Sequence, residues 1–435
     1  MSPSSHKNIP LRTAASIAVA NMVGTGVFTS LGYQVVDIQS VFALIMLWVL
    51  GGMVALCGAL TYGELGTALP RSGGEYHLLG AIYHPSLGFL AGWVSATAGF
   101  AGPTAIAAIA LGKYTATVFP DTPVNHLAAA AVVLFAVIHG YSVKLGSFFQ
   151  DFFTLIKIAV IIVLVILGWN IAQPQDISLV PVFSDWGVIA SPAFAVALVY
   201  VSYAYTGWNA SAYIVGEMKN PQRDLPRALF LSTLLVTVLY AALNYIFLYT
   251  VPMAELAGKV EVAFVSGNHI LGPAAANILS ITISVLMVST ISAMVFVGSR
   301  ITQVMGEDFR IMRRLSIWSR RHTPVNAIIF QTFVTLFFIY SSTFEQVIVY
   351  AAFTLMLVTT LTVAGVYVLR YRQPGLERPY KTWGYPVTPA IFLLANLWIM
   401  GYVILEKPVE SLIGLGIIGM GGLVYFINQR WIAPQ

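Results

Sequence analysis

The stretch Asn21-Met22-Val23-Gly24-Thr25-Gly26-Val27-Phe28 lies in the middle of the first long apolar run of the sequence. Two glycines and a threonine weaken an α-helix here, at a depth where lipid would otherwise require one. Irregular backbone persists inside a membrane only where it is buried in protein or lines a polar cavity. The stretch therefore indicates either a notch for close helix packing or part of a binding site.

A second candidate for a broken helix is Tyr203-Ala204-Tyr205-Thr206-Gly207-Trp208-Asn209, in the sixth apolar run. Five crossings separate the two breaks, so the two segments would run through the membrane in opposite directions. Such paired breaks indicate a substrate site near the midplane, because helix N-terminal amides attract an anion and freed carbonyls bind a cation. A zwitterion presents both charges. The inverted repeat is inferred from placement, since the two halves show no residue-by-residue similarity.

The composition is that of a membrane protein. Of the 435 residues, 58% are hydrophobic and only 9% are charged, whereas about a quarter of the residues in a soluble domain are charged. Lipid is therefore expected to be the main solvent. The single cysteine, Cys57, can form no internal disulfide. The sequence shows no histidine and cysteine cluster for a metal and no nucleotide-binding loop, so neither a metal nor a cofactor is expected.

The apolar runs predict the number of membrane spans. A bilayer core of about 30 Å requires about 20 apolar residues in a helix. Twelve runs meet this requirement, at residues 13–36, 41–63, 86–112, 125–143, 150–172, 190–216, 228–251, 271–299, 325–343, 346–369, 385–405 and 409–429. The sequence therefore predicts an all-α membrane protein whose residues 1–435 form a single transmembrane domain.

The distribution of lysine and arginine predicts the orientation, because basic loops are retained in the cytoplasm. With the N-terminus inside, the outer loops hold only Lys113, Lys259 and Lys407 of the 22 basic residues. Both termini are therefore expected in the cytoplasm of a protein of the inner (cytoplasmic) membrane. The basic stretch 300–321 is expected to be an interfacial helix and not a nucleic-acid surface, since no loop is long enough for a soluble domain. Its arginines would face the headgroups, and lipid would be faced by Phe309, Ile311, Met312, Leu315 and Trp318. The sequence says nothing about protein partners.

Lys157 is the only basic residue well within a predicted span, about 10 Å inside the start of the fifth. An ionisable group there is a functional hypothesis by default, although a lysine near a helix end can also reach the interface. The acids Glu64, Glu75 and Glu217 fall at cytoplasmic helix ends or loops. They are expected to pair with neighbours such as Arg71 or Arg223.

Three motifs carry a resemblance to a known family. They are Gly24-Thr25-Gly26-Val27-Phe28, Pro70-Arg71-Ser72-Gly73-Gly74-Glu75-Tyr76 and Glu217-Met218-Lys219-Asn220-Pro221-Gln222-Arg223-Asp224-Leu225-Pro226-Arg227-Ala228. The chain resembles the amino acid–polyamine–organocation superfamily and is most similar to bacterial relatives of L-type amino acid transporters. The resemblance implies a LeuT-type fold. Its two inverted five-helix repeats would span about residues 10–172 and 190–370, followed by two helices at 384–430.

The resemblance also implies a substrate site at the two breaks. The substrate carboxylate would meet the backbone amides of the Gly24-Thr25-Gly26 motif, chiefly at Thr25 and Gly26, with help from the Thr25 hydroxyl. The α-amino group would meet the carbonyls of three residues, Met22, Tyr203 and Thr206.

The same resemblance assigns roles to side chains of the second break. Tyr203 occupies the position of an aromatic lid over the substrate, and Asn209, Thr206 and Ser202 are candidates for a polar lining. Family members often have two glycines before the tryptophan, whereas this chain has Thr206-Gly207. The added side chain should narrow the pocket.

For Lys157, the resemblance implies that its ammonium replaces the sodium ion of sodium-coupled relatives. It would bridge carbonyls of the first helix and hydroxyls of the eighth, where Ser289, Thr290 and Ser292 are the possible partners. Transport would then be independent of sodium.

These observations favour a secondary transporter of amino acids that works by alternating access. Neutral amino acids are the expected substrates, because the spans place neither an acid nor an arginine near the midplane. Exchange, facilitated diffusion and proton symport remain open. The alternatives are a polyamine or cationic amino acid antiporter, and a non-transporting sensor or channel on the same scaffold. An enzyme is not expected, since the spans contain no paired carboxylates.

Overall fold

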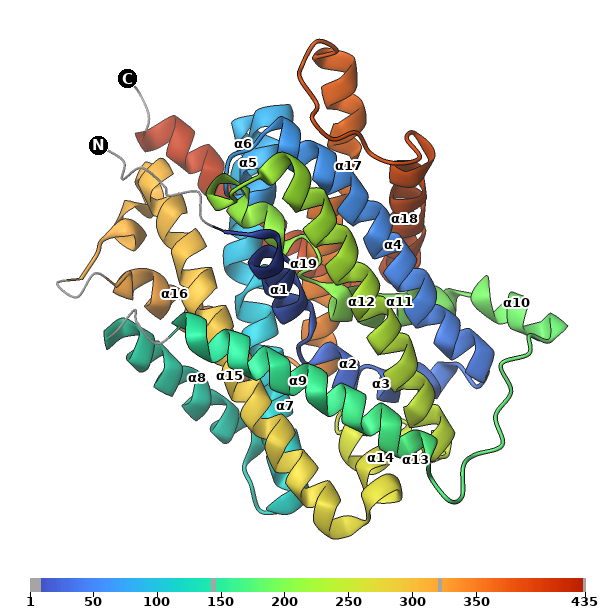
Figure 1. The fold of residues 1–435 in the computed structure, drawn as a ribbon. Coiled ribbons are helices and arrows are strands. Elements are labelled where there is room, and N and C mark those ends of the chain that lie inside the picture. Colours follow the sequence, from blue (N-terminus) through green and yellow to red (C-terminus); the bar gives the residue numbers. More distant parts are fainter. Residues whose placement is uncertain (1–8, 142–145, 320–322, 433–435) are drawn as a thin grey trace.

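The computed structural model describes residues 9–141, 146–319 and 323–432 (Figure 1). All regular structure in these residues is helical, apart from one isolated β-bridge between Ile9 and Met218. In the first part of the chain the helices are α1 (Leu11–Met22), α2 (Gly26–Thr29), α3 (Leu31–Asp37), α4 (Val41–Ala68), α5 (Gly74–Ile82), α6 (Pro85–Val94), the π-helix η1 (Ser95–Gly99), α7 (Ala101–Val118), α8 (Val124–Tyr141) and α9 (Gly146–Trp169).

The second part of the chain is also helical throughout. It contains α10 (Phe183–Ile189), α11 (Pro192–Tyr205), the 3₁₀-helix η2 (Ala210–Glu217), α12 (Pro221–Thr250), α13 (Met253–Leu256), α14 (Val262–Leu271), α15 (Pro273–Asp308), the 3₁₀-helix η3 (Arg310–Ser316), α16 (Val325–Ser341), α17 (Phe344–Arg372), α18 (Val387–Glu406), α19 (Pro408–Ile427) and the π-helix η4 (Asn428–Ile432).

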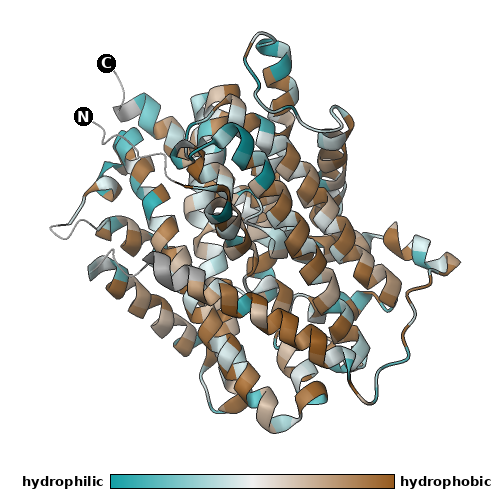
Figure 2. Cartoon of the chain, in the orientation of Figure 1, coloured by the Kyte–Doolittle hydropathy of each residue, from teal (hydrophilic) through white to brown (hydrophobic). Residues whose placement is uncertain are grey.

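The predicted all-α, many-span membrane protein is confirmed. Ten helices of the described residues are long and apolar enough to cross a bilayer, and the bent pair of α10 with Pro192–Glu217 makes up to eleven. The apolar helix α16 has 17 residues. The number twelve remains a prediction. Hydrophobic residues run along the lengths of the helices, while hydrophilic residues gather mainly at their ends (Figure 2).

The helices define two ends of the molecule that matter for the site. The α5 end holds α5, the start of α12 and the segment between α17 and α18, in the upper part of Figure 1. The α14 end holds α3, α13 and α14, of which α13 contacts α3 and α14 contacts α2. The breaks after α1 and α11 lie between these ends.

Aromatic side chains form the packing between α4, α11 and α12. Trp48, Tyr205 and Tyr240 are all fully buried. The ring centroids of Trp48 and Tyr240 lie 5.6 Å apart, and those of Tyr205 and Tyr240 lie 5.2 Å apart. Because such rings have few rotatable bonds and bury large areas, they hold the second break rigidly against α4 and α12.

The basic stretch at 300–321 differs from the expected lipid-facing interfacial helix. α15 continues to Asp308 and is followed by the short helix η3. Met312 is buried with Phe89, and Phe309 packs on the same cluster with ring centroids 4.5 Å from Phe89. The prediction was wrong for these side chains, because they cover α6 instead of facing lipid. Residues 320–321 lie outside the described part of the chain.

Candidate functional site

The first break separates α1 from α2. The helix ends at Met22, Val23 has a non-helical ψ of 80°, and the Gly24 amide turns back to the Met22 carbonyl at 2.7 Å. The next helical residue is Gly26, with Thr25 before it. Because Val23 and Gly24 are not helical, the amides at the start of α2 lack the usual carbonyl partners four residues earlier.

The second break separates α11 from η2. Thr206 is extended, with φ −51° and ψ 133°, and Gly207 has a φ of 104°. That φ is open to glycine and strained for other residues. A Cβ at Gly207 would also lie 2.7 Å from the Cβ of Asn21. Both the backbone conformation and the close approach to the first break therefore require glycine here.

The two breaks touch, although about 180 residues separate them in the sequence. A Cβ at Gly26 would lie 2.6 Å from the Cα of Ala204, so α2 and α11 meet backbone to backbone. The hydroxyl oxygens of Thr25 and Tyr203 lie 3.3 Å apart, within hydrogen-bonding distance. The packing notch and the candidate site that the sequence offered as alternatives are thus the same place.

A cavity of about 970 Å³ lies at this contact. Its volume is at the upper end of the range of about 300 to 1,000 Å³ that is typical of small-molecule sites. All seven residues predicted at the two breaks line it: Met22, Gly24, Thr25, Gly26, Tyr203, Thr206 and Asn209. The cavity extends from the breaks to the α5 end, where Arg71, His77 and Asp308 line it.

On the side of the breaks toward the α14 end, several side chains pack against one another. Tyr33 of α3 stacks on Tyr200 with ring centroids 5.6 Å apart, and on Phe344 at 6.2 Å. The Tyr200 hydroxyl donates to Glu345 at 2.6 Å, and Lys407 forms an ion pair with the same carboxylate at 2.8 Å. None of these five side chains lines the cavity. Tyr33 and Phe344 instead line a separate pocket of about 440 Å³, together with Lys259 of the α14 end. An aromatic layer therefore lies between the cavity at the breaks and the α14 end.

Tyr240 is a residue of the site that the sequence analysis missed. Its hydroxyl donates to the Met22 carbonyl at 2.6 Å and lies 3.3 Å from the Ala204 carbonyl, so it bridges both breaks. The Met22 oxygen also accepts from Gly24, so two hydrogen bonds already occupy it. An α-amino group would have to compete for this carbonyl. The only signal in the sequence was a tyrosine within an apolar run.

Thr206 and Tyr203 form hydrogen bonds with residues three or four positions away in the sequence. The Thr206 hydroxyl donates to the Ser202 carbonyl one turn earlier at 3.2 Å, and the Tyr203 carbonyl accepts from the Thr206 amide at 3.0 Å. The Thr206 carbonyl accepts no hydrogen bond within the described residues. Of the three carbonyls expected at an amino group, it is the one that remains open.

Asn209 binds a carboxylate that the sequence analysis placed elsewhere. Its Nδ2 donates to Glu75, which also accepts from the hydroxyls of Tyr62, at 2.8 Å, and Tyr213. Glu75 is only 3% exposed and lines the cavity. The expected pairing with Arg71 or Arg223 was wrong, because Glu75 faces α4 and η2 instead of the surface. One carboxylate thus lies closer to the break than the spans indicated.

Lys157 is buried, with 4% of its surface exposed, and is not a lysine at the interface. Its Nζ donates to the Thr290 hydroxyl of α15 at 2.9 Å, and Thr290 lines the cavity. Of the three possible partners, the structure therefore selects Thr290, while Ser292 hydrogen-bonds to His139 at 2.9 Å. No carbonyl of α1 or α2 accepts from Lys157, and no carboxylate pairs with it, among the described residues.

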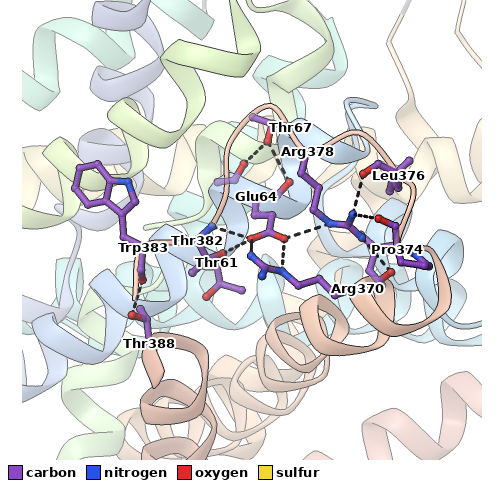
Figure 3. Close-up of polar contacts among 12 residues, drawn as sticks. Thr61, Glu64, Thr67, Arg370, Pro374, Leu376, Arg378, Thr382, Trp383 and Thr388 are labelled. Atoms are coloured by element: carbon purple, nitrogen blue, oxygen red, sulfur yellow. Dashed lines mark hydrogen bonds and ion pairs between the residues drawn. The ribbon is translucent and has the colours of Figure 1, made fainter. Parts of the chain in front are cut away.

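Glu64 also differs from its prediction. It is fully buried, and Arg370 donates to its two oxygens at 2.8 and 2.7 Å (Figure 3). The amide and hydroxyl of Thr382 each donate to it at 2.8 Å, and Arg378 lies 3.5 Å away. The expected partners Arg71 and Arg223 take no part. This cluster ties α4 to the segment after α17, and none of its members lines the cavity.

The mouth of the cavity at the α5 end carries mixed charges. Burial, and then the neighbouring charge of Arg71, lower the pKa of His77. Tyr76 donates to Asp308, which joins α5 to the end of α15. Both causes favour the neutral form of His77, while the charged residues Arg71, Glu217, Arg300 and Asp308 also line the cavity. The parts of the chain that the structure describes contain no group of side chains suited to a metal ion.

Comparison with known proteins adds an independent line of evidence. The family described as amino acid permease matches residues 9–423. The chain is 30% identical to the large neutral amino acids transporter small subunit 2 of Oryctolagus cuniculus, over 98% of this chain and 81% of that protein. It is 28% identical to the b(0,+)-type amino acid transporter 1 of Homo sapiens, over 97% of this chain and 87% of that protein.

Proposed function

This chain belongs to the amino acid permease family and transports amino acids, and on that premise we propose that its substrates are neutral and that their transport needs no sodium. The observation that carries the proposal is the cavity in which both helix breaks meet, with a buried lysine behind its wall. At the cavity, the amides of Thr25 and Gly26 and the carbonyl of Thr206 have no hydrogen-bond partner within the described residues, which suits a zwitterion. Lys157 supplies a cation that is already part of the protein.

The proposed binding mode follows from the groups left open. The substrate carboxylate binds the amides at Thr25 and Gly26, which have no helical partners. The α-ammonium binds at the second break, where the Thr206 carbonyl accepts no hydrogen bond within the described residues. Met22 contributes less than the sequence suggested, because its carbonyl is already bonded twice. Tyr203 covers this position from α11.

Two features support a neutral side chain. Glu75, the carboxylate that bonds to Asn209 of the second break, already accepts from three side chains, so it is poorly placed to bind a cationic substrate group. One of the relatives that match nearly the whole chain is named for large neutral amino acids. The cationic and polyamine alternatives predict instead that Glu75 releases its partners to bind a second substrate cation.

Lys157 supports independence from sodium. Its ammonium lies in a buried position and bonds to Thr290, a residue of the cavity wall. We assign it the role of a fixed cation that joins α9 to α15 and, through the contact of α9 with α1, supports the first break. A sodium ion at the same place would meet electrostatic repulsion.

We place the α5 end in the cytoplasm, because the basic loops would lie there. Both termini are then cytoplasmic, the protein lies in the inner (cytoplasmic) membrane, and the cavity faces inward. The proposed cycle alternates between this form and one that opens at the Tyr33 and Tyr200 layer. A LeuT-type arrangement of residues 10–172 and 190–370, with 384–430 appended, accounts for two breaks that meet at one site.

The test uses purified protein in proteoliposomes. Uptake of labelled leucine is competed with each of the twenty amino acids and with putrescine, with and without leucine inside. The proposal predicts saturable uptake, acceleration by internal leucine or a measurable uniport, and competition by neutral amino acids. Competition mainly by lysine, arginine or putrescine would support the cationic alternative. Current without saturation would indicate a channel, and binding without flux would indicate a sensor.

A further inference from the structure

Glu75 combines burial with an unusual set of partners. It is 3% exposed and sits in the first turn of α5. Oε1 accepts from Tyr62 of α4 and from Asn209, and Oε2 accepts from Tyr213 of η2. The basic residues on its own segment are Arg71 and His77, and neither pairs with it among the described residues. Neutral donors alone satisfy this carboxylate.

The chemistry of a carboxylate determines how Asn209 must point. An ionised carboxylate only accepts hydrogen bonds, whereas an asparagine amide has a donating end and an accepting end. Asn209 can therefore bond to Glu75 only through Nδ2, as observed. Its other end, Oδ1, accepts no hydrogen bond within the described residues, and Asn209 lines the cavity. Glu75 thus leaves an acceptor, and not a donor, available at the second break.

We propose that Glu75 is a positioning residue that fixes the Asn209 amide so that its oxygen accepts a hydrogen bond from the substrate. This inference rests on the proposed function, and it deepens it by assigning the polarity of the second break. The substrate donor that every amino acid carries is its α-ammonium group. Thr206 and Asn209 both line the cavity, so the proposal assigns the Thr206 carbonyl and the Asn209 oxygen to the same ammonium group as an acceptor pair. That pair compensates for the Met22 carbonyl, which already accepts two hydrogen bonds.

A simpler role for Glu75 would be to hold η2 against α4 and α5. Its bonds to Tyr62 and Tyr213 serve that purpose, and they need any acceptor, not a particular amide orientation. The two roles differ in one respect. If Glu75 has only a structural role, replacing Glu75 or Asn209 should impair transport and combining the two replacements should not restore it. If Glu75 positions Asn209, placing the amide at position 75 and the carboxylate at position 209 should restore substrate binding.

The experiment compares the KM for leucine of the wild type, Glu75→Gln, Asn209→Asp and the double variant in proteoliposomes, at matched amounts of folded protein. Glu75→Gln should raise KM about tenfold, because a glutamine amide can offer a donor to Asn209 and turn its oxygen away. Asn209→Asp should raise KM at least as much, since it places two carboxylates together. In the double variant the introduced glutamine amide donates to the introduced aspartate, whose second oxygen faces the cavity. KM should then return to within about threefold of the wild type.

Tyr62→Phe is the matched control, because it removes another hydrogen bond to the same Glu75 oxygen and leaves the Asn209 pair intact. It should leave KM within about twofold of the wild type. Losses that multiply in the double variant would overturn the proposal. If Glu75→Gln does not fold, the double variant must still bind more tightly than Asn209→Asp. A wild type that carries no amino acid would refute the proposed function itself, which separates the two failures.

Discussion

Two buried charged side chains of opposite sign, Glu64 and Lys157, differ in the partners that surround them. Glu64 meets Arg370 and Arg378 and accepts two further bonds from Thr382. Lys157 has no charged partner in the described part of the chain and bonds to the Thr290 hydroxyl alone. The first cluster lies away from the cavity, and the second lies at its wall.

This difference in partners indicates that Glu64 serves the stability of the fold and Lys157 serves transport. A buried charge that is matched by opposite charges and hydrogen bonds ties two segments together, and removing one member leaves the others uncompensated. A buried charge without a counter-charge destabilises the fold, so its presence indicates a role in the activity. If this division is correct, substitutions in the Glu64 cluster should affect stability, and substitutions at Lys157 should affect transport.

Glu64→Ala should give the largest effect, on stability. It leaves Arg370 and Arg378 without their carboxylate and should reduce the free energy of unfolding by about 3 to 5 kcal/mol. The measurement is the thermal midpoint and yield of monodisperse protein in detergent. The control is Arg223→Ala, an exposed residue of the same end, which should change little. Transport per folded molecule should stay near that of the wild type. A loss of transport without a loss of stability would contradict the assignment of Glu64 to the stability of the fold.

Lys157→Ala should show the reverse pattern. Transport should fall about a hundredfold, because the fixed cation at the cavity wall is lost, while the thermal midpoint stays equal or rises. Lys157→Arg should retain a small part of the activity, since a planar guanidinium fits poorly in the place of a compact ammonium. The measurement is the initial rate of uptake by each variant at matched membrane expression. Lys113→Ala, at an exposed lysine, is the control. Normal uptake by Lys157→Ala would end its functional assignment.

Tyr240→Phe should have a smaller effect on the breaks themselves. It removes the hydroxyl that bridges the Met22 and Ala204 carbonyls, worth about 1 kcal/mol. KM should rise about fivefold, because the loss of this link between the two breaks outweighs the release of the Met22 carbonyl. Tyr83→Phe is the control, because it removes a tyrosine hydrogen bond, at 3.0 Å, to the Leu361 carbonyl of α17, and neither residue lines the cavity. Both variants should lose similar stability. An equal rise in KM for both would mean that Tyr240 serves packing and not the site.

Replacing sodium should have no effect. Uptake in choline or potassium buffer should match that in sodium within about twofold, since Lys157 already supplies the positive charge that a coupled ion would bring. The measurement is the initial rate of leucine uptake at fixed ionic strength and pH. Strict dependence on sodium would contradict the role of Lys157 as a fixed cation, even if Lys157→Ala were inactive.

Much of the fold could be predicted from the sequence, because lipid imposes strong local rules. Backbone groups in a bilayer must bond within their own helix, so the helices follow the apolar runs closely. The breaks were predicted from glycine within such runs, and Lys157 was singled out by its position within one of them. The short helices α5, α13 and α14 were not predicted, since each is too short to stand out as a membrane span, even where it is apolar as in α14.

The partners of the buried polar groups could not be predicted in the same way. Glu64 and Arg370 are 306 residues apart, and Glu75 and Asn209 are 134 apart. Nearby basic residues such as Arg71 were the reasonable expectation from the sequence, and both assignments were wrong. Among three hydroxyls on one stretch of α15, only the rotation of the helix decided that Thr290, and not Ser292, meets Lys157.

Local features of the sequence thus indicate which segments are apolar enough to cross the membrane, where two helices break and which lysine lies within an apolar run. These are local properties, set by the solvation of each segment in lipid. The meeting of the breaks at one cavity, the bridge from Tyr240 and the bond between Glu75 and Asn209 come from the packing of distant segments. Such contacts depend on the tilt and rotation of helices that pack together, and packing across distant segments leaves no periodic pattern in either one.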